Sequence, residues 1–370
     1  DDKEIVKIVF KTYRQTELGC KFCTFDTNEV LTNKGWKTFK ELDGTEKICS
    51  LVDNEYIEYV EPVGIYHFEH DGAMISIQGE QIASTTTPEH KLYIKERHGS
   101  GYKPNYELRE ARDVYQRRIR FRKDGTMRGD DIDTISLGES EFNMDAYLEM
   151  LGLWVSDGHL NKSSKKEVSF SFKKDRKIQL FMSITQRLKV VVTHDKHGIG
   201  HNIMNSDIYT SLVALNVGAI NKYLPEFVWD LNQRQARILL EALIAGDGTV
   251  QKNYTAFYTS SKKLANDVQR LCLHAGWSGT IRLMRPEGSN YYIREGNCGT
   301  TNASALAVRI IKSKNQPIIN NVAKSRNNQR HNIDVIHYKG VVSCVEVPSH
   351  VFYMRENGIP HWTGNSNRAG

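Results

Sequence analysis

The stretches "MLGLWVSDGHL" at residues 150–160 and "LEALIAGDGTV" at residues 240–250 align without gaps, and they decide the fold of the central part of the chain. Apolar residues precede the Asp-Gly pair of each stretch at helical spacing. A polar, strand-like segment and a second probable helix follow each one. Two copies of one helix–strands–helix unit predict an α/β domain with pseudo-two-fold symmetry.

Two acidic residues, Asp157 and Asp247, end the two predicted helices. Small residues stand four apart before each of them: Gly152 and Ser156 in the first helix, Ala242 and Gly246 in the second. Such a stripe lets two helices pack closely, which would place the two carboxylates side by side. Adjacent carboxylates repel each other and therefore suit a divalent cation between them. Carboxylates and phosphate oxygens are the usual ligands of Mg²⁺, and such sites hydrolyse phosphodiesters.

The repeated motif resembles that of the two-motif LAGLIDADG homing endonucleases, over about residues 135–325. The resemblance implies a monomer that cleaves double-stranded DNA with Mg²⁺ held by Asp157 and Asp247. It also implies a lysine near the scissile phosphate. The candidates are Lys262 and Lys263 after the second motif, with Lys173 and Lys174 as counterparts after the first. A solvated surface position is an equally good interpretation of each lysine.

Short alternating segments flank this domain on both sides. They fill residues 21–95 and return from about residue 331, with Gly, Asn and Asp between them. This pattern is typical of short antiparallel strands. The sequence therefore predicts a discontinuous β domain over about residues 20–130 and 330–365, with its termini close together.

Polar residues occur in a fixed order through these β segments: Cys20, Thr87, His90, Cys344, His350, Asn365 and Ser366. In that order they resemble the blocks of an intein, a protein-splicing element of the Hint (hedgehog/intein) fold, which is horseshoe-like and all-β. The resemblance implies autocatalytic splicing without a cofactor. It also implies that the nuclease cuts the intein-free copy of the host gene. Residues 1–19 and 366–370 would then be extein segments, the flanks that belong to the host protein.

The first splicing step needs a nucleophile, an acid and an oxyanion stabiliser. By resemblance, the Cys20 thiol attacks the carbonyl of Gly19 and turns the amide into a thioester. His90 protonates the departing amine. Thr87 holds the strained peptide or its oxyanion.

The later steps need a second nucleophile and a way to release the far end. By the same resemblance, the Ser366 hydroxyl takes the acyl group. Asn365 then cyclises to a succinimide with the help of His350. An acyl shift leaves a normal peptide bond between Gly19 and Ser366.

The sequence departs from the family pattern at two positions near the C-terminus. Gly364 stands where most inteins have a histidine; His361 lies nearby, but "HWTG" is longer than the usual ending. Cys344 stands where most members have Asp, and a thiol there suits proton transfer or acyl transfer. Members that use this cysteine as the first nucleophile lack an N-terminal Cys and carry a Trp at the position of Leu92. The ordinary pathway through Cys20 is therefore favoured.

The N-terminal junction has two candidate cysteines. Spacing to Asp26 makes Cys23 a competitor of Cys20. Starting at Cys20 joins the flanks as "TELGSNRAG", whose "GSNRAG" fits the phosphate-loop pattern G-x-x-x-x-G, whereas starting at Cys23 gives "GCKFSNRAG". The sequence thus favours Cys20, with a host ATPase that resembles the phage terminase large subunits. The Cys-x-x-Cys spacing also raises the hypothesis of a Cys20–Cys23 bridge that makes splicing redox-sensitive.

The composition of the chain bears on its class and on its partners. The 370 residues carry a net charge of +6, which is compatible with a polyanionic partner. No apolar run approaches the length of a membrane span, and six cysteines are few for a secreted disulfide scaffold. We expect a cytoplasmic protein. The alternatives are a nuclease with a β binding module, disfavoured by the terminal Asn-Ser and the Cys20 junction, and an ATPase fragment, disfavoured by its short flanks.

Overall fold

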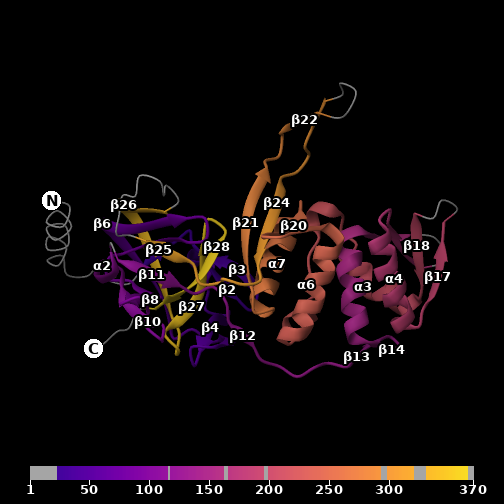
Figure 1. Ribbon diagram of the computed structural model, residues 1–370, viewed down its shortest axis with the longest axis horizontal. Helices are drawn as coiled ribbons and strands as arrows, with labels where there is room; N and C mark the ends of the chain where they lie inside the picture. The colour runs from indigo at the N-terminus through magenta and orange to yellow at the C-terminus, as the bar shows by residue number, and fades with distance from the viewer. Residues whose placement is uncertain are drawn as a thin grey trace. The chain divides into compact units, whose positions relative to one another are not determined.

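The computed structural model describes residues 23–115, 117–161, 166–195, 199–292, 298–320 and 331–365. The chain divides into two compact units (Figure 1), each described here by itself. The β unit contains the described residues up to Thr126 and from Lys312 onward, and the α/β unit contains Met127–Ile311. The predicted residues Gly19, Cys20 and Ser366 lie outside the described ranges.

Two long strands from distant parts of the sequence form the centre of the β unit. β6 (Gly64–Gly79) and β26 (His331–Glu346) pair antiparallel along their whole length. β1 (Thr24–Phe25) pairs with both β26 and β7 (Ala83–Thr86), which closes a barrel in the order β1-β26-β6-β7. The segments on either side of the insert therefore build one structure, with the N-terminal strand fixed against strands from both.

A larger antiparallel sheet completes the β unit. Its members are β2 (Glu29–Thr32), β3 (Gly35–Thr38), β4 (Ile48–Val52), β5 (Tyr56–Val60), β8 (Lys91–His98), β9 (Gly101–Tyr102), β10 (Glu107–Glu110), β11 (Arg118–Phe121), β25 (Ile318–Asn320), β27 (Val351–Glu356) and β28 (Ile359–Gly364), with β12 (Thr126–Met127) at the sequence boundary. Short helices η1 (Phe39–Glu41) and α2 (Ala111–Val114) lie between strands. β25 pairs with β11, so residues 312–320 belong to this unit. The sequence had assigned residues up to about 325 to the insert, because a three-residue strand carries too little pattern to be recognised.

The α/β unit repeats one order of elements. Its first half contains α3 (Met144–Asp157), β15 (Gly158–Asn161), β16 (Glu167–Ser171), α4 (Asp175–Leu188), β17 (Val191–His194) and β18 (Gly200–Met204). Its second half contains α6 (Gln233–Asp247), β19 (Gly248–Gln251), β20 (Tyr254–Thr259), α7 (Lys262–His274), β21 (Ser278–Arg285) and β24 (Ala305–Ile311). The sheet orders, β15-β16-β18-β17 and β19-β20-β24-β21, follow the same scheme.

Shorter elements join and extend these two halves. They are β13 (Thr134–Leu137), β14 (Ser140–Asn143), α5 (Ser206–Leu212), η2 (Val213–Leu215), η3 (Ala219–Asn221), η4 (Glu226–Asp230), β22 (Asn290–Tyr292) and β23 (Cys298–Thr300). In Figure 1 the β22 region extends outward from β21 and β24.

Helices α3 and α6 pack on each other through their small residues. A Cβ on Gly152 would lie 2.6 Å from the Cβ of Ala242, and a Cβ on Gly246 would lie 2.4 Å from that of Ser156. Real Cβ atoms do not approach so closely, so the stripe predicted from sequence is needed for this contact. The two helices end in Asp157 and Asp247.

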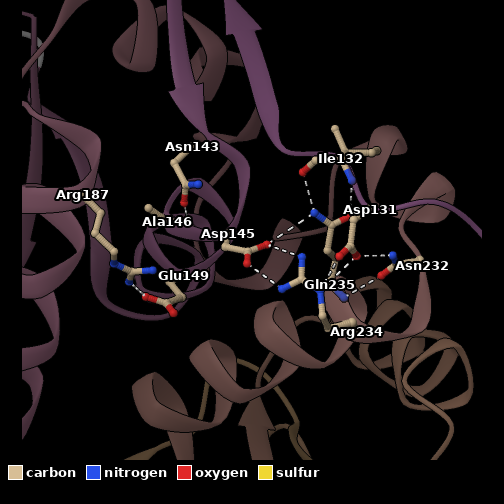
Figure 2. Close-up of polar contacts among 10 residues, drawn as sticks. All are labelled: Asp131, Ile132, Asn143, Asp145, Ala146, Glu149, Arg187, Asn232, Arg234 and Gln235. Atoms are coloured by element: carbon tan, nitrogen blue, oxygen red, sulfur yellow. Dashed lines mark hydrogen bonds and ion pairs between the residues drawn. The ribbon is translucent and has the colours of Figure 1, made fainter.

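Polar contacts fix the N-terminal ends of the same two helices (Figure 2). Asn143 Oδ1 accepts from Ala146 N at 3.0 Å, and Asn232 Oδ1 accepts from Gln235 N at 2.9 Å, as N-cap residues do. Arg234 on α6 makes an ion pair with Asp145 on α3, with Nη1 2.6 Å from Oδ2. The helix pair is therefore held at its start by charge and along its length by close packing.

Candidate active sites

The first candidate site lies where α3 and α6 end. Each terminal aspartate is followed by a glycine whose backbone N–H caps the helix, Gly158 on Trp154 O and Gly248 on Ile244 O. A Cβ on Gly158 would lie 2.2 Å from Trp154 Cδ1, and one on Gly248 2.5 Å from Ile244 O. The Asp-Gly pair thus reflects the sharp turn from helix to strand that positions each carboxylate.

The electrostatics of the two carboxylates differ. Asp157 makes an ion pair with Lys177 on α4, and the Asp157 side chain is 23% exposed. Burial raises the pKa of Asp247, and the negative charge of Asp157 raises it further, while Lys177 and Lys222 oppose the shift. Asp247 therefore senses the charge of Asp157 across the end of the helix pair.

Lys222 lies in the same place, although no sequence pattern marks it. Its Nζ donates hydrogen bonds to Val155 O at 2.5 Å and Ser156 O at 2.9 Å, in the last turn of α3. Burial lowers the pKa of Lys222, and the charges of Asp247 and Asp157 oppose that shift. Cations near a helix C-terminus also interact favourably with its dipole. A cavity of about 270 Å³ opens beside Lys222 and is lined by Trp154, His159, Tyr223 and residues 215–219 among others.

The predicted lysines stand at the starts of helices. Lys262 and Lys263 open α7 directly after its cap residue, Ser261. The Lys263 Nζ lies 3.9 Å from the centre of the Tyr223 ring. In the first half, Lys174 is the N-cap of α4, and Lys173 precedes it. The charges that act on the two carboxylates are instead those of Lys177 and Lys222, which the sequence did not single out.

The two carboxylates suit a divalent cation. Burial and then the charge of Asp157 raise the pKa of Asp247, and a bound cation would relieve both effects. Among the described residues, no group of three or more His, Cys, Asp or Glu side chains is placed to hold a metal. Asp157 and Asp247 would thus supply two ligands, and the remaining ones would come from water or from phosphate oxygens.

The second candidate site lies in the β unit, around Thr87 and Cys23. Cys23 N donates to Thr87 Oγ1 at 3.0 Å, and Thr87 N donates to Cys23 O at 2.9 Å. Cys23 is fully buried and packs in one cluster with Met74, Val342 and Cys344. The predicted residues Thr87 and Cys344 thus lie beside Cys23, the cysteine that the sequence disfavours as the first residue of the element.

His90 and Asn365 are two further predicted residues of the β unit, and His90 N donates to Thr87 O at 3.0 Å. His90 Nε2 and Thr363 Oγ1 are 2.7 Å apart, and His90 is fully buried. Asn365, two residues after Thr363, is also fully buried; its backbone N donates to His350 O at 3.0 Å and its Nδ2 donates to Val347 O at 2.9 Å. The Asn365 Oδ1 and the His350 Nδ1 are buried without a hydrogen-bond partner. The backbone of Asn365 is therefore fixed beside that of His350.

The structure explains why position 364 holds a glycine. A Cβ at this position would lie 2.4 Å from Lys91 O and 2.7 Å from Leu108 Cδ2. A histidine therefore does not fit here without movement of the β8 backbone. His361 does not take its place beside Asn365: it is buried against Phe121, with ring centres 5.7 Å apart. Burial, with smaller effects of Lys123 and His90, lowers the pKa of His361 to about 3.

One family model matches part of the chain, mostly in the second half of the α/β unit. Residues 234–317 match the LAGLIDADG-like domain. The matched segment contains α6 from its second residue onward, α7 and the second sheet, and with them Asp247 and both predicted lysines of that half. None of the helices in the described ranges has the length and hydropathy of a membrane-crossing segment.

Two curated relatives align with nearly the whole chain. One, named as the C-terminal section of the DNA-directed RNA polymerase subunit beta of Stigeoclonium helveticum, is 28% identical over 94% of this chain and 37% of its own length. The other, the ATP-dependent Clp protease proteolytic subunit of Chlamydomonas moewusii, is 23% identical over 94% of this chain and 46% of its own. The chain thus spans less than half the length of these relatives.

Two solved structures are also similar to the chain. One is the AceL NrdHF class 3 split intein, in a glutathione-linked, splice-inactive variant. It is 8% identical, with coverage of 93% of this chain and 99% of that chain and a TM-score of 0.30. The other is the homing endonuclease I-DmoI, in mesophilic variants. It is 16% identical, with coverage of 46% of this chain and 90% of that chain and a TM-score of 0.31.

Proposed function

We propose that the chain is a self-splicing element that carries a site-specific DNA endonuclease. The observation that carries the nuclease half is the convergence of Asp157 and Asp247 at the ends of two closely packed helices, in a unit with a LAGLIDADG-like domain. A bound Mg²⁺ would polarise the scissile phosphate and activate water. Lys177 and Lys222 hold positive charge beside the carboxylates, and the exposed sheet residues Arg282 and Arg285 suit a phosphate backbone.

The nuclease proposal is tested with DNA from the host gene without its insert. With Mg²⁺, the wild-type chain should cut both strands near the insertion point, and Asp157→Ala and Asp247→Ala should each abolish cleavage. Lys252→Ala, on the exposed turn after β19, serves as the matched control and should cut normally. Cleavage that survives the loss of both carboxylates would remove the proposal.

The splicing half rests on the joint placement of Thr87, His90 and Asn365 in the β unit. A cysteine thiol at the N-terminal junction attacks the preceding carbonyl; the C–S bond forms, the C–N bond breaks, and the amine leaves with a proton from His90. The Ser366 hydroxyl then displaces the thiolate and takes the acyl group.

Asn365 completes the reaction. Its Nδ2, fixed by Val347 O at 2.9 Å, attacks its own backbone carbonyl and releases Ser366 as a free amine. His350, which lies beside it, assists by proton transfer. The ester on Ser366 then shifts to this amine and leaves a peptide bond. Ligated product in the wild-type chain and its loss in Asn365→Ala test this half.

The host and the setting are narrower proposals. If the element begins at Cys20, the "GSNRAG" join favours a host ATPase that resembles a terminase and is interrupted in its phosphate loop. We also propose a cytoplasmic monomer that acts on double-stranded DNA. The relatives carry other names, an RNA polymerase subunit and a Clp protease subunit. Sequencing the gene on both sides of the insert tests the host assignment, since a lysine followed by Ser or Thr should come directly after Gly370.

A further inference from the structure

We propose that the splicing element begins at Cys23 rather than at Cys20, so that the N-terminal scissile bond joins Phe22 to Cys23. This inference rests on the proposed self-splicing and specifies where that reaction begins. The sequence had favoured Cys20 because of the phosphate-loop pattern in the joined flanks. The contacts of Thr87 lead to a different assignment.

Thr87 holds the peptide nitrogen of Cys23. The Cys23 N–H donates to Thr87 Oγ1 at 3.0 Å, while Cys23 O accepts from Thr87 N at 2.9 Å and from Thr87 Oγ1 at 3.3 Å. An acyl shift from nitrogen to sulfur takes place within one residue, because the thiol attacks the carbonyl attached to its own nitrogen. The nitrogen that Thr87 binds is therefore the leaving group of an attack by the Cys23 thiol.

The register of β1 fixes which residue faces Thr87. Thr24 lies opposite Ser343 on β26 and Thr86 on β7, and its Oγ1 donates to Thr85 O at 2.7 Å. Moving Cys20 onto Thr87 requires a slip of three residues in this strand. An odd slip exchanges the two faces of a strand, so it would turn the buried Thr24 outward.

The surroundings of the Cys23 side chain also suit the reaction. Cys23 is fully buried, and Cys344, which is 1% exposed, lies in the same cluster on the strand that pairs with β1. Because Cys344 lies beside Cys23, its thiol suits proton transfer to or from the Cys23 thiol. The four side chains of the cluster are buried, and burial of this kind would protect a thioester from hydrolysis.

Two consequences follow. Splicing joins Phe22 to Ser366, so the product reads "GCKFSNRAG", the glycine spacing is lost and the argument for an ATPase host falls. In addition, the Cys23 sulfur is disulfide-bonded in the structure, so a thiol reductant must free it before it attacks. The Cys-x-x-Cys spacing predicts Cys20 as the partner, a host residue that would hold the nucleophile of the element.

The experiment places the full chain between two unrelated carrier proteins and sequences the products by tandem mass spectrometry under reducing conditions. The expected product contains Phe22 bonded to Ser366 and keeps Cys20. In an Asn365→Ala background, excess dithiothreitol should release an N-terminal fragment that ends at Phe22. A product that joins Gly19 to Ser366, or a fragment that ends at Gly19, would overturn the inference but leave self-splicing intact.

Matched variants separate the two cysteines. Cys20→Ala should splice fully, and without any need for reductant, whereas Cys23→Ala should give neither thioester nor ligated product. Thermal unfolding of both variants controls for folding. If neither bond is cleaved in a folded and reduced wild-type chain, the self-splicing proposal and this inference both fail.

Discussion

At the scale of single residues, the packing around Gly364 explains why the position holds a glycine. A side chain here would meet the Lys91 carbonyl at 2.4 Å, and backbone does not yield as a flexible side chain does. The departure from a histidine is therefore a packing requirement of this sheet. The proposed proton transfer at Asn365 falls to His350, whose backbone carbonyl accepts from Asn365 N at 3.0 Å.

Substitution at Gly364 should therefore slow C-terminal cleavage. Gly364→Ala is expected to destabilise the chain by about 1–3 kcal/mol, the usual cost of overpacking, and to lower the rate of succinimide formation because Asn365 moves. Chemical denaturation and the rate of Ser366 release measure the two effects. Gly101→Ala is the matched control, since a Cβ there meets nothing within 4 Å; equal behaviour of the two variants would contradict the packing explanation.

The ionised carboxylate of Asp247 should lower the folding stability of the chain while serving the proposed DNA cleavage. Because burial and the Asp157 charge raise its folded-state pKa, the ionised carboxylate costs stability above that pKa, and the cost vanishes as pH falls through it. Asp247→Asn should therefore raise Tm at pH 7, by about 2–4 °C for a unit of this size, and change it little at pH 3. Mg²⁺ should raise the Tm of the wild-type chain only. A lower Tm for the variant at pH 7 would mean that the carboxylates do not repel.

At the scale of elements, the α3–α6 contact depends on small residues at a few positions. Gly246→Ala should destabilise the α/β unit by about 1–3 kcal/mol and reduce DNA cleavage, because its Cβ would meet that of Ser156 at 2.4 Å. Ser156→Gly removes the clashing atoms. The double variant should regain most of the stability that Gly246→Ala loses. A double-mutant cycle by denaturation measures the coupling between the two positions. Simple additivity of the two changes would show that the helices do not meet there.

The elements differ in how well the sequence predicts them. The repeat around Asp157 and Asp247 was recognisable because two long helices carry the same pattern and end in the same turn. Lys222 was not, because it follows the short helix η3 and its position depends on how that segment folds back onto α3. Likewise, Cys20 was preferred to Cys23 on the residues that flank the insert, whereas the contacts with Thr87 depend on strand register, which the sequence does not display.

At the scale of the whole molecule, the insert leaves and re-enters the β unit at neighbouring points. Lys123 N donates to Asn315 O and Phe121 N donates to Pro317 O, each at 3.0 Å. The two ends of the β unit are therefore joined by backbone hydrogen bonds without help from the insert. Residues 312–314, where the chain re-enters the β unit, are exposed, and exposed points tolerate domain insertion and removal.

Replacing residues 127–311 by a short Gly-Ser linker should therefore leave a folded, splicing β unit without DNA cleavage. Circular dichroism and the yield of ligated product check this outcome. A deletion of equal length that also removes part of β26 serves as the control. It should abolish both folding and splicing. Loss of folding in the linker variant would show that the β unit needs its insert.

Self-splicing is the central claim, and the intact mass of the full chain, fused between two carriers and reduced, tests it most directly. The account predicts that the precursor disappears, that the two carriers become covalently joined, and that the excised element ends in a succinimide formed from Asn365. A folded precursor that keeps its full mass with free thiols and an unchanged Asn365 would contradict it.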